Sequence, residues 1–290
     1  MKKVIIFSVM ALSIAMGFTS CLKDESLTLD TSKSNNVTEF GNTGTPATLP
    51  TDGAAVRFAI DLGSLVAGDT TSFNINVDYA GAKMAPEDIQ VTVDIDESLL
   101  PTYNSAHEAD DANVLMPIEG LIKSSFPQTI TIPKGQQFGQ AKVKIELPSD
   151  FDFNVMYGLP LKITKTSVGE VSGNFGTAIY SFVVRNLYDG IYKYSMDGWF
   201  SSTFTEDNAE LVTTGATTVQ GNLFYYYSNT ITYNIDPATN VVSVKAVSGG
   251  YAIVNYPDES KYDPATKSMH VVYDILGGHI VEDFEYVGPR

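Results

Sequence analysis

The chain has 290 residues, with 34 acidic and 18 basic side chains and a formal charge of −16 at pH 7. This negative charge argues against nucleic acid and anionic lipid as partners, since both are bound through clustered Lys and Arg. A hydrophobic content of 43% excludes a disordered chain, and the length favours two domains.

The N-terminus has the layout of a secretory signal. Met1-Lys2-Lys3 is a short basic segment, and an uncharged, largely apolar run of 15 residues follows from Val4 to Phe18. That run is shorter than the roughly 20 apolar residues that span a bilayer. No second apolar run approaches membrane length, so any membrane attachment is expected through a lipid anchor only.

The signal ends in Phe18-Thr19-Ser20-Cys21, which resembles a bacterial lipobox. The resemblance implies that residues 1–20 are removed as a lipoprotein signal peptide and that Cys21 receives acyl chains such as palmitate. Cys21 is the only cysteine, so it has no intramolecular disulfide partner, and lipidation accounts for it. The alternative is an incidental cysteine in an ordinary signal peptide.

The residues after Cys21 refine the expected location. Leu22-Lys23-Asp24-Glu25-Ser26 resembles the export signal of Bacteroidetes lipoproteins, which implies an outer-membrane protein facing the cell exterior. The alternative is the start of an acidic linker. Residues 21–53 are rich in polar and turn-forming side chains, so we expect a lipidated, flexible tether.

Residues 54–186 are predicted to form an Ig-like β-sandwich. Apolar and polar side chains alternate in four segments, which places an apolar row on one face of each strand. The segments are 56–61, 73–79, 89–95 and 141–147. Leu99 to Phe126 breaks the pattern with prolines and an acidic run, and we expect a long loop there with one helical turn at most.

Residues 187–290 are predicted to form a smaller antiparallel β-sandwich or lipocalin-like β-barrel, so the whole chain is expected to be all-β. Two near-identical turns, Asp236-Pro237-Ala238-Thr239-Asn240 and Asp263-Pro264-Ala265-Thr266-Lys267, each precede a strand and indicate repeated hairpins. The expected strands are 191–196, 217–220, 230–235, 241–247, 251–255, 268–275 and 281–287.

Three further motifs resemble those of a known protein family. Tyr157–Ile163 is similar to a strand of an N-terminal domain of unknown function in Bacteroidetes surface lipoproteins, and Tyr188–Tyr192 is similar to the start of the C-terminal domain often joined to it. Tyr262–Lys267 with Val271–Asp274 is similar to the final hairpin of that domain.

The resemblance implies a SusE-like surface glycan-binding protein of a polysaccharide-utilisation system. Its implied partners are a glycan ligand, a SusD-like protein and a TonB-dependent transporter. The alternative function is a structural or adhesin-type surface protein that binds another protein.

Aromatic side chains offer platforms for the apolar faces of sugars, and two clusters contain candidates. One holds Trp199, the only tryptophan; the other holds Tyr225, Tyr226 and Tyr227. In a strand, Tyr225 and Tyr227 would share one face and Tyr226 the other. The alternative is that these aromatics fill the core, but we expect at least one of the four to contact ligand.

The sequence holds no motif for catalysis or for a cofactor, so we expect a protein that is not an enzyme and has neither cofactor nor metal. Asp150–Asn154 begins like a calcium loop, but Val155 stands where that loop needs glycine and Leu161 where it needs glutamate. The histidines His107, His270 and His279 lack metal-ligand spacing.

Asp69-Thr70-Thr71 resembles a short O-glycosylation motif of exported Bacteroidetes proteins. Thr70 is the acceptor that this resemblance implies.

Overall fold

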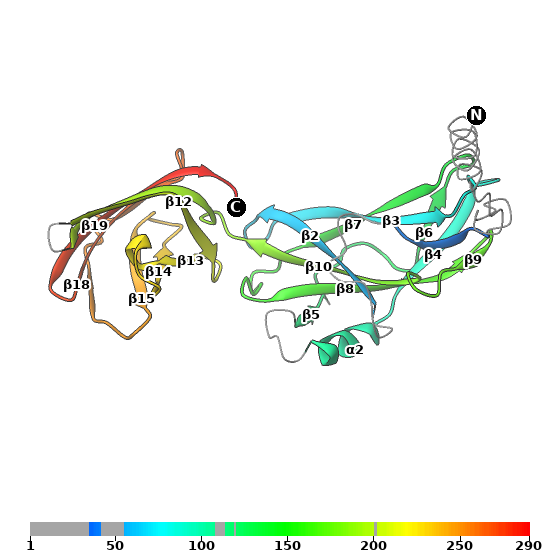
Figure 1. Cartoon of the computed structure of the whole chain (residues 1–290), viewed down its shortest axis with the longest axis horizontal. Coiled ribbons are helices and arrows are strands. Elements are labelled where there is room, and N and C mark those ends of the chain that lie inside the picture. Colours follow the sequence, from blue (N-terminus) through cyan, green and yellow to red (C-terminus); the bar gives the residue numbers. More distant parts are fainter. Residues whose placement is uncertain (1–34, 42–54, 108–113, 119, 200–201) are drawn as a thin grey trace, which may run out of the picture.

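The computed structural model describes residues 35–41, 55–107, 114–118, 120–199 and 202–290. Two bodies lie end to end along the long axis of the molecule, and strands make up most of both (Figure 1). The predicted all-β fold is confirmed. Each body has its own apolar core, one built around residues such as Ile75 and Tyr180 and the other around Ile231 and Tyr273.

The N-terminal body is a sandwich of two sheets. One sheet has the strand order β7-β3-β1-β9, and the other has the order β2-β10-β8-β4-β6, with β5 beside β8. The strands are β1 (Val37–Phe40), β2 (Val56–Ser64), β3 (Thr70–Ala80), β4 (Ile89–Ile95), β5 (Leu115–Pro117), β6 (Gln128–Ile132), β7 (Phe138–Glu146), β8 (Met156–Thr166), β9 (Glu170–Val171) and β10 (Thr177–Arg185). The alternating side chains predicted for β2, β3, β4 and β7 bury their apolar rows between the sheets.

Strand β1 corrects the prediction that residues 21–53 form a flexible tether throughout. Val37–Phe40 pairs with β3 on one side and with β9 on the other, and the Thr38 side chain is fully buried. Asn36 is also buried, and its amide donates to the backbone carbonyl of Tyr79 at 3.0 Å. A four-residue strand among polar residues is too short to show a period of two, which is why the sequence pattern missed it.

The segment predicted as a loop between Leu99 and Phe126 contains more regular structure than expected. Helix α2 (Leu99–Ala106) makes two turns, and it buries Leu100 and Tyr103. Its Asn104 side chain donates to the carbonyl of Leu115 and accepts from the Leu115 amide, both at 2.9 Å. This paired contact fixes the start of β5 beside the helix.

The C-terminal body is one strongly curved antiparallel sheet. Its strand order is β15-β14-β13-β12-β11-β19-β18-β16, with β17 beside β18. The strands are β11 (Gly190–Trp199), β12 (Ser202–Thr213), β13 (Thr218–Asn222), β14 (Thr230–Ile235), β15 (Val242–Val247), β16 (Ile253–Asn255), β17 (Lys261–Asp263), β18 (Ser268–Ile275) and β19 (Gly278–Gly288).

Side chains close the gap between the two ends of this sheet. The Asn255 amide on β16 donates to the carbonyl of Val244 on β15 at 3.0 Å, and its oxygen accepts from the Val244 amide at 2.7 Å. An isolated bridge also joins Val241 to Lys261. The body is therefore a near-barrel whose edge strands meet through an asparagine side chain rather than a full backbone ladder.

The two repeated turns of the C-terminal body form as predicted. Asp236 accepts a hydrogen bond from the Ala238 amide at 2.8 Å, and Asp263 accepts one from the Ala265 amide at 2.9 Å. These hydrogen bonds lower the pKa of both carboxyl groups. Each turn thus uses an aspartate to satisfy an amide two residues later.

Two ion pairs, one in each body, lie beside the junction between the bodies. Arg185, at the end of β10, contacts Asp61 of β2 at 2.6 Å, and its guanidinium donates to the carbonyl of Arg290. The buried carboxylate of Asp189 accepts from the Thr213 amide at 2.8 Å and lies 3.4 Å from the Arg290 guanidinium. The end of the chain thus lies beside the junction (Figure 1).

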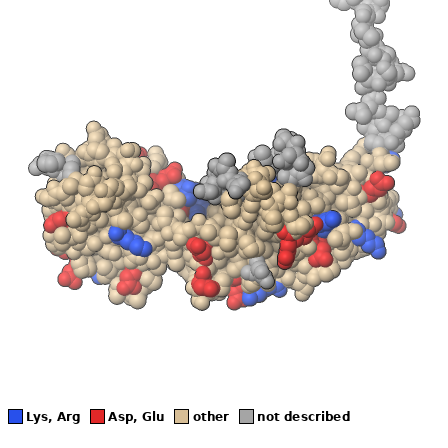
Figure 2. Space-filling model, turned by 90° about the horizontal axis from the view of Figure 1, so that it is seen from below, with Lys and Arg blue, Asp and Glu red and all other residues tan. Residues whose placement is uncertain are grey.

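Acidic side chains are spread over both bodies on the face shown in Figure 2, interspersed with the fewer Lys and Arg. Within the described parts of the chain, no helix has the length and apolarity needed to cross a membrane.

Candidate functional site

Three aromatic side chains form a surface cluster on the C-terminal body, which we call the aromatic patch. It consists of Phe204 on β12 and of Tyr226 and Tyr227, which follow the short helix η2 (Leu223–Tyr225). The Tyr226 ring centroid lies 5.0 Å from that of Phe204 and 5.1 Å from that of Tyr227. Tyr226 is 68% exposed and Tyr227 38% exposed, so both present ring surface to solvent.

The local structure around the patch differs from the strand arrangement considered for Tyr225, Tyr226 and Tyr227, and residues 225–227 lie outside the strands that were expected. The chain instead makes a 3₁₀ turn between β13 and β14, so Tyr225 and Tyr227 do not share a strand face. Phe224 and Tyr225 both have positive φ angles, 56° and 50°. This conformation costs a residue other than glycine about 1–2 kcal/mol, and such strain concentrates at functional sites.

A third strained residue lies next to the patch, in another hairpin. Leu276, in the turn between β18 and β19, has a φ of 52°. It lines a small cleft of about 150 Å³ together with Phe224, Tyr227 and Tyr251. Three strained residues other than glycine therefore lie around one end of the C-terminal body.

Tyr225 is positioned differently from its two neighbours. Its ring packs 4.7 Å from that of Tyr194, and its hydroxyl donates to the carbonyl of Glu210 at 2.8 Å. Burial, with the nearby Glu282 carboxyl, raises its pKa. Tyr225 thus holds the turn against the sheet, and it exposes less ring surface than Tyr226 and Tyr227.

Beside the patch lies a depression of about 500 Å³, which we call the polar groove. Tyr225 forms part of its wall, and Glu206 is two residues from Phe204 on β12, so groove and patch are contiguous. Its lining includes two carboxylates and no Lys or Arg. The polar side chains of the lining are Glu206, Asn208, Glu210, Gln220, Asn222, Tyr225 and Thr230.

A buried carboxyl group lies beneath the site. Glu282 on β19 is fully buried and accepts hydrogen bonds from the hydroxyls of Tyr194 and Tyr233, each at 2.7 Å. Burial raises the pKa of Glu282 to about 7, against the lowering effect of these hydrogen bonds. The cluster ties β11, β14 and β19 together inside the near-barrel.

The other residues singled out in the sequence lie elsewhere. Trp199 ends β11, but its side chain is outside the described part of the structure, as is Cys21. Thr70 is exposed at the first position of β3. His270 pairs with Asp283 at 2.6 Å, and His279 pairs with Asp274 at 2.7 Å.

Sequence reasoning missed Phe204 and the polar residues of β12. The sequence does contain a run of acidic and amide side chains between Thr205 and Glu210 that could have indicated these residues. A solvated loop has the same composition, so the run does not by itself predict a site.

Two family models match the chain, one for each half. A family described as an N-terminal domain matches residues 40–170, and a domain of unknown function, DUF7015, matches residues 190–288. Among curated proteins, no sequence matches this one.

Several solved structures from Bacteroides are similar to this chain. A protein of unknown function from Bacteroides ovatus is 14% identical and has a TM-score of 0.55, with 87% of this chain and 95% of that chain covered. An auxiliary nutrient-binding protein from Bacteroides thetaiotaomicron is 16% identical, with a TM-score of 0.46 and coverage of 83% and 91%. A candidate carbohydrate-binding protein from Bacteroides ovatus is 11% identical, with a TM-score of 0.40 and coverage of 74% and 68%.

The first of these structures shows that the two-body fold occurs in a Bacteroides protein over nearly its whole length. Residues 40–170 of the chain are thus similar to a family of N-terminal domains, and residues 190–288 are similar to DUF7015. A Bacteroides protein shares the fold of the whole chain.

Proposed function

We propose that this protein binds glycan at the bacterial cell surface, and that the aromatic patch and the polar groove of the C-terminal body form the binding site. The observation that carries the proposal is the contiguity of exposed tyrosine rings with a groove lined by carboxylates and amides.

The chemistry of this pair of features suits a sugar. The rings of Tyr226 and Tyr227 offer apolar surface to the C–H face of a pyranose, and the groove offers acceptors and donors to its hydroxyls. The strained turn holds the rings in place before ligand arrives, which reduces the entropy lost on binding. The carboxylates of Glu206 and Glu210 favour neutral sugars over anionic ones by charge repulsion.

Binding is measured by retardation in native gels that contain a neutral polysaccharide, followed by calorimetry with oligosaccharides of the glycan that binds. The panel includes mannans, glucans, xylans and a polygalacturonate as the anionic member. We expect Tyr226→Ala to weaken binding at least tenfold, while Tyr226→Phe, which keeps the ring, retains most of it.

The matched control is Phe138→Ala on β7 of the N-terminal body, which removes an aromatic ring that is 62% exposed. This control is expected to bind as the wild type does. Equal binding by the Tyr226→Ala variant and the wild type, or no retardation by any member of a broad panel, contradicts the proposal.

The proposal extends to the location and partners of the protein. In this proposal Cys21 carries the lipid anchor, and the residues that follow it act as the export signal to the outer face of the outer membrane. The captured glycan then passes to a SusD-like protein and a TonB-dependent transporter. The role is capture without catalysis. This part rests on the resemblance of the N-terminal sequence to lipoprotein signals.

Labelling of cells with a radioactive fatty acid tests the anchor. We expect label in the wild type and none in the Cys21→Ser variant, with the wild type also digested by protease added to intact cells. Label in the variant contradicts Cys21 as the lipidated residue. Protection of the wild type from protease contradicts the outward location.

A further inference from the structure

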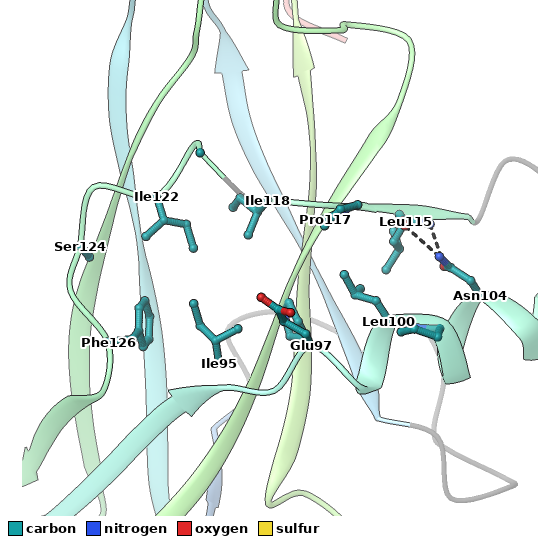
Figure 3. Close-up of a pocket in the computed structure, with 13 residues that line it drawn as sticks. Ile95, Glu97, Leu100, Asn104, Leu115, Pro117, Ile118, Ile122, Ser124 and Phe126 are labelled. Carbon is teal, nitrogen blue, oxygen red and sulfur yellow. Dashed lines mark hydrogen bonds between the residues drawn. The ribbon is translucent and has the colours of Figure 1, made fainter.

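The N-terminal body contains an apolar pocket of about 610 Å³, distant in the sequence from the aromatic patch. It lies between the connection from β4 to α2, strand β5 and the segment that leads to β6 (Figure 3). Its walls are mostly aliphatic and aromatic side chains, which converge on the hollow. These are Ile95, Leu100, Leu115, Ile118, Ile122 and Phe126.

The deep wall of the pocket is fixed by the core. Leu100, Leu115 and Ile118 are 6%, 1% and 3% exposed, and the first two pack in a cluster with Tyr103 and Ile179. The hydrogen bonds between Asn104 and the backbone of Leu115 hold α2 and β5 at a set separation. The hollow is therefore preformed, as ligand pockets of this size usually are.

The two uncharged polar side chains of the wall, Asn104 and Ser124, are already engaged. Asn104 uses both ends of its amide on Leu115, and the Ser124 hydroxyl accepts from the Lys144 amide at 2.8 Å. A sugar in this pocket would leave several hydroxyls unpaired, each at a cost of about 1–3 kcal/mol. The pocket chemistry thus differs from that of the polar groove and disfavours a glycan.

One charged side chain faces the hollow. The Glu97 carboxylate points between Ile95 and Ile118 in Figure 3. It makes no hydrogen bond or ion pair with any residue that the structure describes, whereas the neighbouring Asp96 lies 3.8 Å from the Lys162 ammonium. A negative charge at the edge of an apolar cavity favours a ligand that combines a positive charge with a hydrophobic body.

We propose that this pocket binds a small amphipathic cation, with its hydrocarbon body against the apolar wall and an ammonium or guanidinium group against Glu97. The site is independent of the proposed glycan site, because the two lie on different bodies and share no residue.

Three probes of equal length test the assignment: octylammonium, octanol and octanoate, each titrated below its micellar concentration and followed by NMR shifts and calorimetry. We expect octylammonium to bind about tenfold more tightly than octanol at low salt, and octanoate to bind least. Equal affinities for the three probes, or no binding by any of them, overturn the proposal.

Two variants separate charge from shape. Glu97→Gln is expected to bring octylammonium to the affinity of octanol, while Glu87→Gln, an exposed carboxyl outside the pocket, leaves the preference intact. Ile122→Gln is expected to weaken all three probes and to leave glycan retention unchanged. A cation preference that survives Glu97→Gln overturns the role of the carboxylate, and probe binding that Ile122→Gln leaves unchanged overturns the location.

Discussion

Glu282 is fully buried and accepts two short hydrogen bonds from tyrosine hydroxyls. Its pKa of about 7 makes the folding stability of the C-terminal body depend on pH. In the unfolded chain this carboxyl titrates near 4.5. Between these values the folded state keeps a proton that the unfolded state releases, so folding stability falls as pH rises through this window. The total loss is on the order of 3 kcal/mol, and it is complete above about pH 7.

Glu282→Gln is expected to remove this pH dependence, because the amide does not titrate and tyrosine hydroxyls both donate to and accept from it. The measurement is the free energy of unfolding in denaturant at pH 5, 6, 7 and 8 for both proteins. The variant should gain stability relative to the wild type from pH 5 to pH 7, and the difference should level off between pH 7 and pH 8. A constant difference across the series would show that the folded-state carboxyl is already ionised at pH 5, which contradicts a raised pKa.

Single residues also mark the limit of sequence reasoning about the site. The sequence alone indicates Tyr226 and Tyr227 as candidates, because three consecutive tyrosines between amide residues are unusual. Their exposure was not predictable, since it follows from the positive φ angles of Phe224 and Tyr225, which tertiary packing imposes. Glu282 gave no sequence signal, because a glutamate in an alternating strand is expected on the wet face.

At the scale of elements, strands with unbroken alternation were predicted within a few residues. The predictions for 230–235 and 268–275 coincide with β14 and β18. Strand β12 was missed, because its pairing with β11 shifts register between Tyr192 and Tyr194 and its apolar residues therefore do not alternate. Only Ala209 and Leu211 of this strand are buried.

The turn between β18 and β19 holds a residue poorly suited to its conformation. Ile275 pairs with Gly278, and the two residues between them, Leu276 and Gly277, have φ angles of 52° and 78°. This geometry favours an Asn-Gly turn. Leu276→Asn is expected to raise the free energy of unfolding by about 1 kcal/mol, since little packing is lost from a side chain that is 59% exposed.

Asn240 provides the matched control, because it has a φ of 58° in the turn after β14. Asn240→Leu should lower stability by a similar amount in the same denaturant experiment. Opposite effects of the two substitutions support backbone strain as the cause, while a loss of stability in Leu276→Asn would show that the leucine side chain contributes more than its strain costs.

At the scale of the whole molecule, the two cores share no side chain, and each ion pair beside the junction joins residues of a single body. We expect two thermal transitions in calorimetry. Ile75→Ala in the N-terminal core and Ile231→Ala in the C-terminal core should each cost about 2–5 kcal/mol and lower a different transition. A single transition that both substitutions shift would show that the bodies unfold as a unit.

Strand β1 has a mechanical consequence for a chain held at its N-terminal end. It lies between antiparallel β3, with which all four residues pair, and parallel β9, with which Val37 and Thr38 pair. Ladder hydrogen bonds run across the strands, so tension directed along β1 loads them together in shear. Tension directed across the strand would instead break these bonds one at a time. Drag on a captured polymer would therefore meet a clamp of four residues before it reaches the core of the N-terminal sandwich.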